Sequence, residues 1–392
     1  MLRMPRIDLL LICVGCTAFA QQIDVTVVND LDFDRKEIVS IPVSDITRII
    51  KKKYENIHLT KKGQSTDLQL QWVDYDGDGN PDELLFQAEV PAKGKSEYSL
   101  FRDASPSVLT ASETKAFSRF VPERTDDYAW ENDKVAFRTY GPDAKKRFDQ
   151  KQPNGTLSSG IDIWLKRTDK PVIDKWYLGY QSDPMFYHKD RGEGYDPYHV
   201  GASRGTGGTG FWNGKKLEVP TNFIGYKTIA TGDLRTIFEL SYAPYGTYGI
   251  VETKRISLDL GSNFCRFEVR MNSKANLANC AVGITLHDNK GEVKMDKAKG
   301  IFRYFEPIDD AFVGEGIVVD PDSILDAFTQ TLENESDQNH LLVLLKTDRK
   351  IVYYAGFAWT KSKQVSNVSD WDILLERQSQ ILANPLRVTL VK

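Results

Sequence analysis

The sequence predicts an all-β protein whose main body is a large antiparallel β-sandwich with few, short helices. Many short segments alternate apolar and polar side chains, and this period of two is typical of strands that bury one face. Gly-, Asn- and Asp-rich breaks separate the segments about every ten residues, and aromatic residues make up 11% of the chain. Strands and long helices do not alternate along the chain, which argues against a doubly wound fold.

The expected strands follow one another along the chain. The segments that largely alternate are Ile23–Val28, Leu68–Val73, Ile161–Trp164, Val251–Leu258 and Cys265–Met271. Two later segments are apolar almost throughout, namely His340–Leu345 and Ile351–Tyr354. Because a strand that is apolar on both faces is buried on both faces, we expect these two to lie inside a sheet.

Helices are expected to be few. The candidate segments are Ser44–Lys52, Ile324–Leu332 and Trp371–Leu382. In the last of them the apolar residues recur at helical spacing and fall near one face, which is typical of a helix that packs on a sheet.

The chain beyond its first twenty residues is long enough for one large domain. We expect this single domain to span residues 21–392, with an N-terminal β-unit at 21–110 and the main sandwich at 118–392. Lys, Ser, Thr and Ala dominate residues 93–118, which join the two parts.

The first twenty residues have the layout of a secretory signal peptide. Arg3 and Arg6 precede the apolar run Leu9–Cys16, which is too short to span a membrane, and small residues lead up to Ala20. Cleavage after Ala20 would export the chain across the inner membrane, so we expect a periplasmic protein. The alternative is a lipoprotein acylated at Cys16, because a glycine precedes this cysteine.

The net charge of −4 argues against a nucleic-acid partner, since basic runs such as Lys51–Lys53 are short. A polyanionic substrate is compatible with this charge, because Arg and Lys can gather locally in a cleft. No later segment is apolar enough to cross a bilayer. Cys265 and Cys280 remain after the signal peptide is removed, and the sequence leaves open whether they form a disulfide.

One acidic loop predicts a calcium site with a structural role. Carboxylates at alternate positions converge on a hard cation when glycines let the loop turn sharply, and three aspartates this close would otherwise repel one another. The alternative is a hairpin turn that holds no ion. The expected ligands are Asp74, Asp76, Asp78, Asn80 and Asp82.

The run Gly205–Gly210 satisfies the dinucleotide-binding pattern G-x-G-x-x-G in form only. A nucleotide site needs this run to follow a strand and to open a helix, whereas the residues after it, Phe211–Gly214, look like a hairpin. We therefore expect no organic cofactor. The glycines suit a tight turn or a close approach of backbone to a ligand.

The densest set of binding-type residues lies between Arg124 and Gly210. This block holds three of the seven Trp and two of the five His, mixed with Arg, Tyr, carboxylates and glycines. A polar ligand needs aromatic platforms, arginine clamps and groups that titrate near neutral pH. The alternative is a set of strands whose Trp and Tyr fill the sandwich core. For the block as a whole we favour a carbohydrate-type site.

Several motifs in and after this block carry a resemblance to a known family. They are Arg124–Pro142, Gly160–Lys166, Lys175–Tyr177, Tyr187–His188, Gly192–Gly201, Ser203–Gly208, Leu234–Leu240 and Ile256–Asp259. Together they resemble domain-of-unknown-function family 4861, which occurs in secreted proteins of bacteria that digest carboxylated polysaccharides. Some members are similar to an oligosaccharide dehydratase of ulvan breakdown. The resemblance implies a carbon–oxygen lyase that eliminates water from the non-reducing-end uronic acid of an oligosaccharide. We expect the sandwich to be of the galactose-mutarotase-like or polysaccharide-lyase-like kind.

That chemistry assigns roles to residues of the block. Loss of the C5 proton of a uronate requires a clamp that neutralises the carboxylate, a base, and an acid for the departing 4-hydroxyl. The candidates for proton transfer are His188, Tyr187 and Tyr195. The candidates for the clamp are Arg204, Arg124, Asn132 and Lys166, and those for the sugar platform are Trp130 and Trp176. The remaining histidines, His58, His199, His287 and His340, are expected to be structural or to face away.

Three other functions stay open at this point. A polysaccharide lyase would share the enolate intermediate and differ only in the leaving group. A glycoside hydrolase would need two carboxylates about 5–10 Å apart, for which the block offers Asp126, Asp127, Glu131 and Glu193. A non-catalytic carbohydrate-binding protein would suit the same aromatic-rich sandwich.

Overall fold

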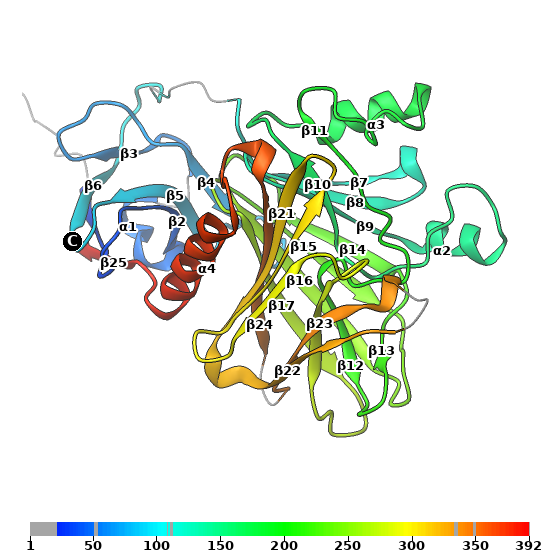
Figure 1. Cartoon of the computed structure of the whole chain (residues 1–392). Coiled ribbons are helices and arrows are strands. Elements are labelled where there is room, and N and C mark those ends of the chain that lie inside the picture. Colours follow the sequence, from blue (N-terminus) through cyan, green and yellow to red (C-terminus); the bar gives the residue numbers. More distant parts are fainter. Residues whose placement is uncertain are drawn as a thin grey trace, which may run out of the picture.

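The computed structural model describes residues 22–391 except for 51–53, 108, 110–112, 333–335 and 348–349. The expected signal peptide, residues 1–20, lies outside the described residues. All paired strands in the described part are antiparallel, apart from one isolated parallel bridge, and they form several sheets (Figure 1). The prediction of an all-β protein with few, short helices is therefore confirmed.

The N-terminal unit consists of two small sheets that enclose a core of their own. Alternating Val and Ile of the first strand point into this core, as the period-two pattern predicts. The strands, in sheet order, are β25 (Arg387–Val391), β1 (Gln22–Val28), β6 (Lys95–Arg102) and β3 (Ile57–Lys61) in one sheet, and β2 (Arg35–Pro42), β5 (Glu83–Val90) and β4 (Leu70–Val73) in the other.

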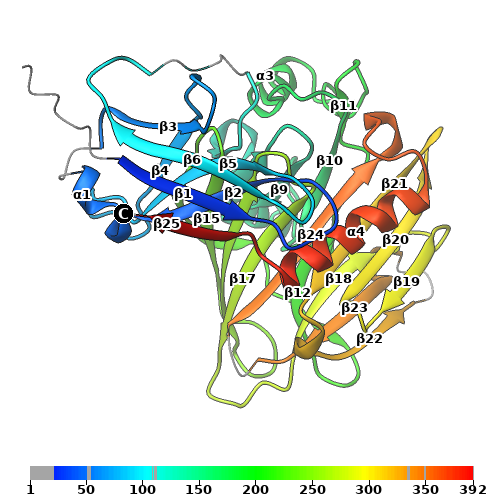
Figure 2. The ribbon, with the colours of Figure 1, turned by 90° about the vertical axis from the view of Figure 1, so that its left-hand side faces the viewer.

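The C-terminal strand β25 belongs to this N-terminal unit. It pairs antiparallel with β1 from Asp24 opposite Val391 to Val28 opposite Arg387. Figure 2 shows the two strands side by side. The sandwich expected over 118–392 thus does not reach the end of the chain, because the last strand completes the first sheet.

The main sandwich has one large sheet on one side and two five-stranded sheets on the other, and all three contribute to a shared apolar core. The large sheet contains, in order, β14 (Phe223–Ala230), β15 (Arg235–Tyr242), β16 (Val251–Asp259), β17 (Phe264–Asn272), β24 (Ile351–Trp359), β21 (Ala311–Val319), β20 (Ile301–Ile308) and β19 (Glu292–Asp296). One of the opposite sheets contains, in order, β13 (Leu217–Glu218), β12 (Thr206–Trp212), β18 (Cys280–Thr285), β23 (His340–Leu345) and β22 (Ile324–Gln330). The other contains, in order, β11 (Gly194–Tyr195), β10 (Asp162–Lys166), β9 (Ala136–Tyr140), β8 (Asp127–Glu131) and β7 (Phe117–Val121).

A glycine joins the two five-stranded sheets. Gly205 forms an isolated parallel bridge with Ile161, just before β12 and β10 begin. Gly205 adopts a φ of +53°, and a Cβ atom there would lie 1.9 Å from the carbonyl oxygen of Ile161. Only glycine allows this approach. The glycine run that resembles a nucleotide motif is therefore used, at this position, to bring two sheets together.

Two longer helices cover opposite parts of the sandwich. Helix α3 (Ile173–Ser182) packs on the outer face of β8–β10, and α4 (Val368–Ala383) packs across β20 and β21. The side chain of Asn367 caps the start of α4. The shorter elements are α1 (Thr47–Ile50), α2 (Pro142–Asp149) and the 3₁₀ turns Val43–Asp45, Pro122–Arg124, Pro321–Ser323, Ser336–Gln338 and Thr360–Ser362.

The expected helices have three different outcomes. The helix expected at Trp371–Leu382 is confirmed as α4. In the segment Ser44–Lys52, the described residues, which end at Ile50, form the end of a 3₁₀ turn and the four-residue α1. The helix expected at Ile324–Leu332 is wrong, because this segment forms strand β22, which pairs with β23. Sheet pairing with a buried neighbour here overrides local helix propensity.

The structure also shows the state of the two cysteines and the character of the helices. Cys265 and Cys280 are buried free thiols, so no disulfide links them. The indole Nε1 of Trp130 lies 3.1 Å from the sulfur of Cys265, inside the sandwich core. Among the described residues, no helix is long and apolar enough to cross a membrane.

Candidate functional site

The outer face of strands β8–β10 carries charged side chains although it is buried. Alternation along β9 turns Phe137 into the sandwich core and Arg138 to the opposite face, where α3 packs (Figure 1). Asp162 of β10 and Asp127 of β8 join Arg138 on that face, and both are 0% exposed. The sheet therefore places a charged cluster beneath a helix.

Arg138 is the centre of this cluster. Its Nε lies 2.6 Å from the Asp162 carboxylate, and its Nη2 lies 2.6 Å from that of Asp196. Its Nη1 donates to the phenol oxygen of Tyr187 at 3.1 Å. The hydroxyl of Tyr140 also donates to Asp162, at 3.0 Å. One guanidinium thus connects β9, β10 and the segment after α3, and we call these five residues the Arg138 network.

Arg124 lies at the edge of the same network. Its Nη1 is 3.5 Å from Asp127, whose other carboxylate oxygen accepts a hydrogen bond from Tyr177 at 3.0 Å. Its guanidinium lies over the rings of Tyr140 and Tyr180, 5.8 Å and 6.0 Å from the centroids. Within the described residues its buried Nε has no hydrogen-bond partner. This N–H is therefore a buried donor that lacks an acceptor in the described part of the protein.

His188 combines a fixed tautomer with partial exposure. Its Nδ1 lies 3.0 Å from the backbone carbonyl of Asp196, and a carbonyl only accepts, so Nδ1 carries the proton. Nε2 is then left with a lone pair. The side chain is 30% exposed. Burial lowers the pKa of His188, and the nearby Arg138 lowers it further, so the neutral imidazole is favoured.

The pKa values of the buried carboxyls in and beside the network shift in the opposite direction, upward. Burial raises the pKa of Asp196 well above its usual range, and the neighbouring Asp162 raises it further. Burial likewise raises the pKa of Asp127, against the effect of Arg124 and Arg138. Burying a charge without a partner is unfavourable, so the two arginines and the three aspartates stabilise one another in the folded protein.

The structure gives other residues of the block structural contacts. Lys166 binds Glu131 at 2.8 Å with both side chains fully buried, and Glu131 accepts the N–H of Val172 and Ile173 at the start of α3. Asn132 orders the turn to Val135. Trp130 and Trp176 are 0% and 3% exposed, and Asp126 caps α2 through the N–H groups of Asp143 and Ala144. The expected clamp residues Lys166 and Asn132 and the expected platform residues Trp130 and Trp176 therefore lie inside the molecule.

Arg204 and Tyr195 lie apart from the Arg138 network. Arg204 is 1% exposed in the sandwich, where it donates to Ser159 and to the carbonyl of Thr209. Burial lowers the pKa of Arg204 to about 10. Tyr195 donates to Asp309 in the turn between β20 and β21. The structure therefore brings together Arg124, Tyr187 and His188, but not Arg204 or Tyr195.

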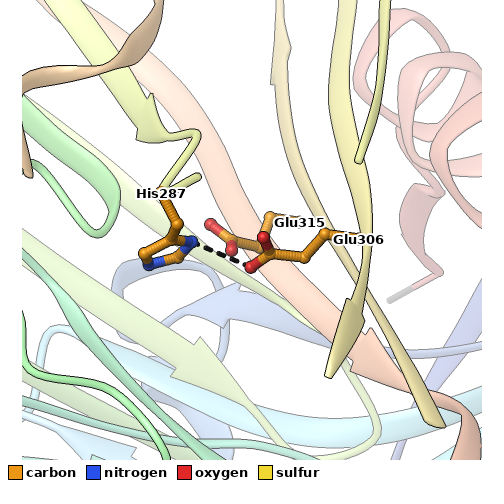
Figure 3. Close-up of side chains that lie close together, drawn as sticks. All are labelled: His287, Glu306 and Glu315. Carbon is orange, nitrogen blue, oxygen red and sulfur yellow. Dashed lines mark ion pairs between the residues drawn. The ribbon is translucent and has the colours of Figure 1, made fainter. Parts of the chain in front are cut away.

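A second cluster of titratable groups lies at one end of the sandwich core. His287, Glu306 and Glu315 place one ligand atom each within 4.8 Å of one another. Figure 3 shows the three side chains pointing toward one another. The Nδ1 of His287 is 2.8 Å from Glu306. The pKa of His287 is raised by Glu306 against the effect of burial, and burial raises that of Glu315 to about 8.

Neither Arg138 nor the His287, Glu306 and Glu315 cluster was predicted, although the sequence carries a signal for the cluster. Glu306 and Glu315 occupy positions that alternation turns into the core, in line with Tyr304 and Ile317. A carboxylate at such a position is informative, because an isolated charge is rarely buried. Arg138 lies inside a quoted motif, but nothing in its strand indicates that a helix will cover that face.

A large cleft lies elsewhere in the molecule. It has a volume of about 890 Å³ and lies between the N-terminal unit, the outer face of the large sheet and α4. Several of its arginines are already paired with acidic neighbours, as in Arg235 with Asp259 and Arg266 with Glu268.

The predicted calcium loop has the geometry of a compact acidic turn. Asp74, Asp76 and Asp78 each place a carboxylate oxygen within 4.8 Å of the others. Asp74 accepts the N–H groups of Gly77 and Gly79, which holds the pKa of its carboxyl below the usual range. The three carboxylates suit a hard cation, whose positive charge would balance theirs and which takes oxygen ligands. Calcium at this loop stays a prediction.

Further contacts in the loop involve Asp82, Asn80 and Lys227. The carboxylate of Asp82 accepts the N–H of Tyr75 at 2.7 Å, and the N–H of Asn80 donates to Asp78. The ammonium of Lys227 lies 3.4 Å from the carbonyl of Tyr75, so it competes with an ion for this side of the loop.

Calcium is expected to raise the melting temperature of the protein. A ligand that binds only the folded state stabilises it by about 2.7 kcal/mol at a hundred times its Kd. Asp76→Ala and Asp78→Ala should each abolish this rise in a thermal melt. Asp103→Ala, in another exposed acidic turn that holds the N–H of Ser105, should leave it intact. A wild-type melting curve that chelator and calcium leave unchanged would contradict the site.

Comparisons with known proteins agree with the resemblance in the motifs. The family model described as a domain of unknown function (DUF4861) matches residues 27–388. "Uncharacterized protein P7" of Formosa agariphila is 42% identical over 371 residues, which cover 93% of each chain.

Two solved structures are similar over 95% of this chain at 8% identity. They are a protein in the glycosyl hydrolase family 38 from Enterococcus faecalis, with a TM-score of 0.46, and an alpha-mannosidase from Enterococcus faecalis V583, with a TM-score of 0.40. The chain spans about half the length of these proteins, 47% and 46%. From the extent of the family match and the identity to the Formosa protein, the chain belongs to the DUF4861 family.

Proposed function

We propose that the protein is a carbon–oxygen lyase that eliminates water from the non-reducing-end uronic acid of an oligosaccharide, such as one derived from ulvan. The product is a 4,5-unsaturated uronate. The observation that carries the proposal is the arrangement at His188, whose Nδ1 proton is held by a carbonyl, so that Nε2 carries the lone pair. Arg124, with its unpaired Nε, and Tyr187 belong to the same cluster. The family resemblance of the motifs supports this substrate class.

Each step of the elimination has a group to perform it. Arg124 binds the uronate carboxylate, and its positive charge lowers the energy of the enolate that forms when C5 loses its proton. His188 Nε2 takes this proton, because a neutral imidazole with a lowered pKa is available as a base at neutral pH. The electron pair of the C5–H bond becomes the C4–C5 double bond, and the C4–oxygen bond breaks.

The leaving hydroxyl needs a proton, and Tyr187 supplies it. The phenol oxygen of Tyr187 accepts a hydrogen bond from Arg138, so its own proton remains available for donation. The rings of Tyr187 and His188 are 4.5 Å apart, centroid to centroid, which places acid and base side by side. Hydroxide and this proton leave as water. A proton returned from His188 restores Tyr187 for the next turnover.

The geometry argues against a glycoside hydrolase in this block. Such an enzyme needs two carboxylates that face a sugar. Asp126 and Glu131 instead bind backbone N–H groups at the starts of α2 and α3. Asp127 is held by Arg124 and Tyr177, and Glu193 pairs with Lys175. We also propose a periplasmic location, in keeping with the amino-terminal segment.

The reaction can be tested with oligosaccharides that end in a uronic acid. We expect the ultraviolet band of a conjugated unsaturated uronate to rise while the oligosaccharide loses the mass of one water. A rise with cleavage of the chain would instead support glycosidic elimination. Cleavage without absorbance would support hydrolysis. Binding without any reaction would support a carbohydrate-binding module, and each of these three results would contradict the dehydratase.

A further inference from the structure

The sandwich-end cluster brings an imidazole and two carboxylates together from three segments. His287 follows β18, Glu306 lies near the end of β20, and Glu315 lies in β21 (Figure 3). Glu315 is 2% exposed and Glu306 is 6% exposed. The three side chains point toward one another (Figure 3). They form a small nitrogen- and oxygen-lined site at the edge of an apolar core.

The two glutamates lack a compensating cation. In the part of the chain that the structure describes, neither Lys nor Arg makes an ion pair with Glu306 or Glu315. Their near neighbour is His287, whose imidazole carries at most one positive charge. Two carboxylates this close in a low-dielectric region repel each other unless one of them is protonated or a cation lies between them.

Neighbouring residues hold the three side chains in place. Thr206 donates to one carboxylate oxygen of Glu315 at 2.6 Å, and the hydroxyl of Tyr198 donates to Glu306 at 2.8 Å. The ring of Tyr198 also stacks on His287, with centroids 4.6 Å apart and planes at 8°. Outer partners of this kind orient the ligands of a metal ion and increase its affinity.

The backbone of His287 is held in an uncommon conformation. Its φ is +45°, which is unfavourable for a residue with a Cβ atom. Asn339 donates to the carbonyl of His287 at 3.0 Å and thereby fixes the turn. Such strain persists where the position of a side chain is needed, and here it directs the imidazole toward Glu306.

From this geometry we infer that His287, Glu306 and Glu315 bind a divalent transition-metal ion, with Zn²⁺ and Mn²⁺ as the ions best suited to a mixed imidazole and carboxylate site. Imidazole nitrogen favours these ions over Ca²⁺, which prefers oxygen ligands alone. Metal–ligand distances of about 2.0–2.2 Å require the ligand atoms, now up to 4.8 Å apart, to close slightly around the ion. The site is separate from the acidic loop at Asp74 and independent of the proposed reaction.

The test measures metal binding directly, by calorimetry and by thermal melts of the mature chain after chelator has been removed. Calcium is present throughout, so that the acidic loop does not compete for the added ion. We expect Zn²⁺ or Mn²⁺ to bind with one ion per chain at this site and to raise the melting temperature. Glu306→Gln and Glu315→Gln should each weaken binding by more than the roughly 10- to 100-fold that loss of an outer partner costs. Tyr198→Phe, which removes such a partner, should weaken it within that range.

The matched control is Glu252→Gln. Glu252 is another fully buried glutamate of the sandwich, and Thr209 donates to it at 2.6 Å, as Thr206 does to Glu315. This variant should bind the ion like the wild type even if its melting temperature falls. If Glu315→Gln does not fold, Glu306→Gln and His287→Gln carry the test. Absence of Zn²⁺ and Mn²⁺ binding by the wild type, or undiminished binding by these variants, would overturn the inference.

Discussion

Replacing His188 by alanine is expected to lower kcat by about two to four powers of ten, the usual contribution of one general acid–base group. The imidazole has no nearby substitute with the same geometry, because Asp196 is bound by Arg138 and Tyr187 accepts from Arg138. Substrate binding should change little, since Arg124 still meets the carboxylate. Steady-state kinetics on a uronate-ended oligosaccharide, followed in the ultraviolet, separate kcat from KM.

The pH profile adds a second readout for the same variant. His188 must be neutral to act as a base, and burial lowers its pKa below the ordinary value of 6.5. Activity should therefore persist below pH 6.5 and fall only as the pH drops through this lowered pKa. His188→Ala should lose that acid limb, whereas His199→Ala, at an exposed histidine of the same block, should keep both rate and limb. Near-normal turnover of His188→Ala would remove His188 from the mechanism.

Replacing Arg138 by methionine is expected to lower the free energy of unfolding by about 3–5 kcal/mol, the cost of breaking a buried ion pair by removing one partner. The change removes the cation that Asp162 and Asp196 both bind at 2.6 Å. Both carboxyls would then stay buried without compensation. Arg138→Lys should restore little, because an ammonium cannot reach two carboxylates and a phenol with one planar group. Urea denaturation measures the difference.

A surface arginine serves as the control for Arg138. Arg255 pairs with Glu239, and the two side chains are 33% and 39% exposed. Arg255→Met should therefore change the free energy of unfolding by less than about 1 kcal/mol, as is usual for exposed ion pairs. If Arg138→Met were as stable as Arg255→Met, the Arg138 network would not hold α3 and the sheet together.

Parts of the candidate site were predictable from the sequence. Arg124, Tyr187 and His188 stand out by residue type within one block, and the structure places them in one cluster. Arg204 belongs to the same block but lies in the sandwich core. Residue type alone does not separate these cases, because a buried arginine and a ligand-binding arginine look the same in a sequence.

Local pattern by itself determined the strands and the last helix. Alternation along Val251–Asp259 leaves every second side chain buried, as observed in β16, and helical spacing after Asn367 gives α4. These features depend on neighbours within a few residues, so the sequence contains them in full. The strand at Ile324–Gln330 was the exception, since its conformation depends on pairing with β23.

Only the tertiary structure decided which faces are buried and which distant segments meet. Alternation separates Phe137 from Arg138, but whether Arg138 meets water or α3 depends on a helix more than thirty residues away. His287, Glu306 and Glu315 come together through the pairing of β20 with β21 and the packing of β18 against them. Contacts at such separations arise from sheet order and from burial of the whole core, which no local stretch of sequence specifies.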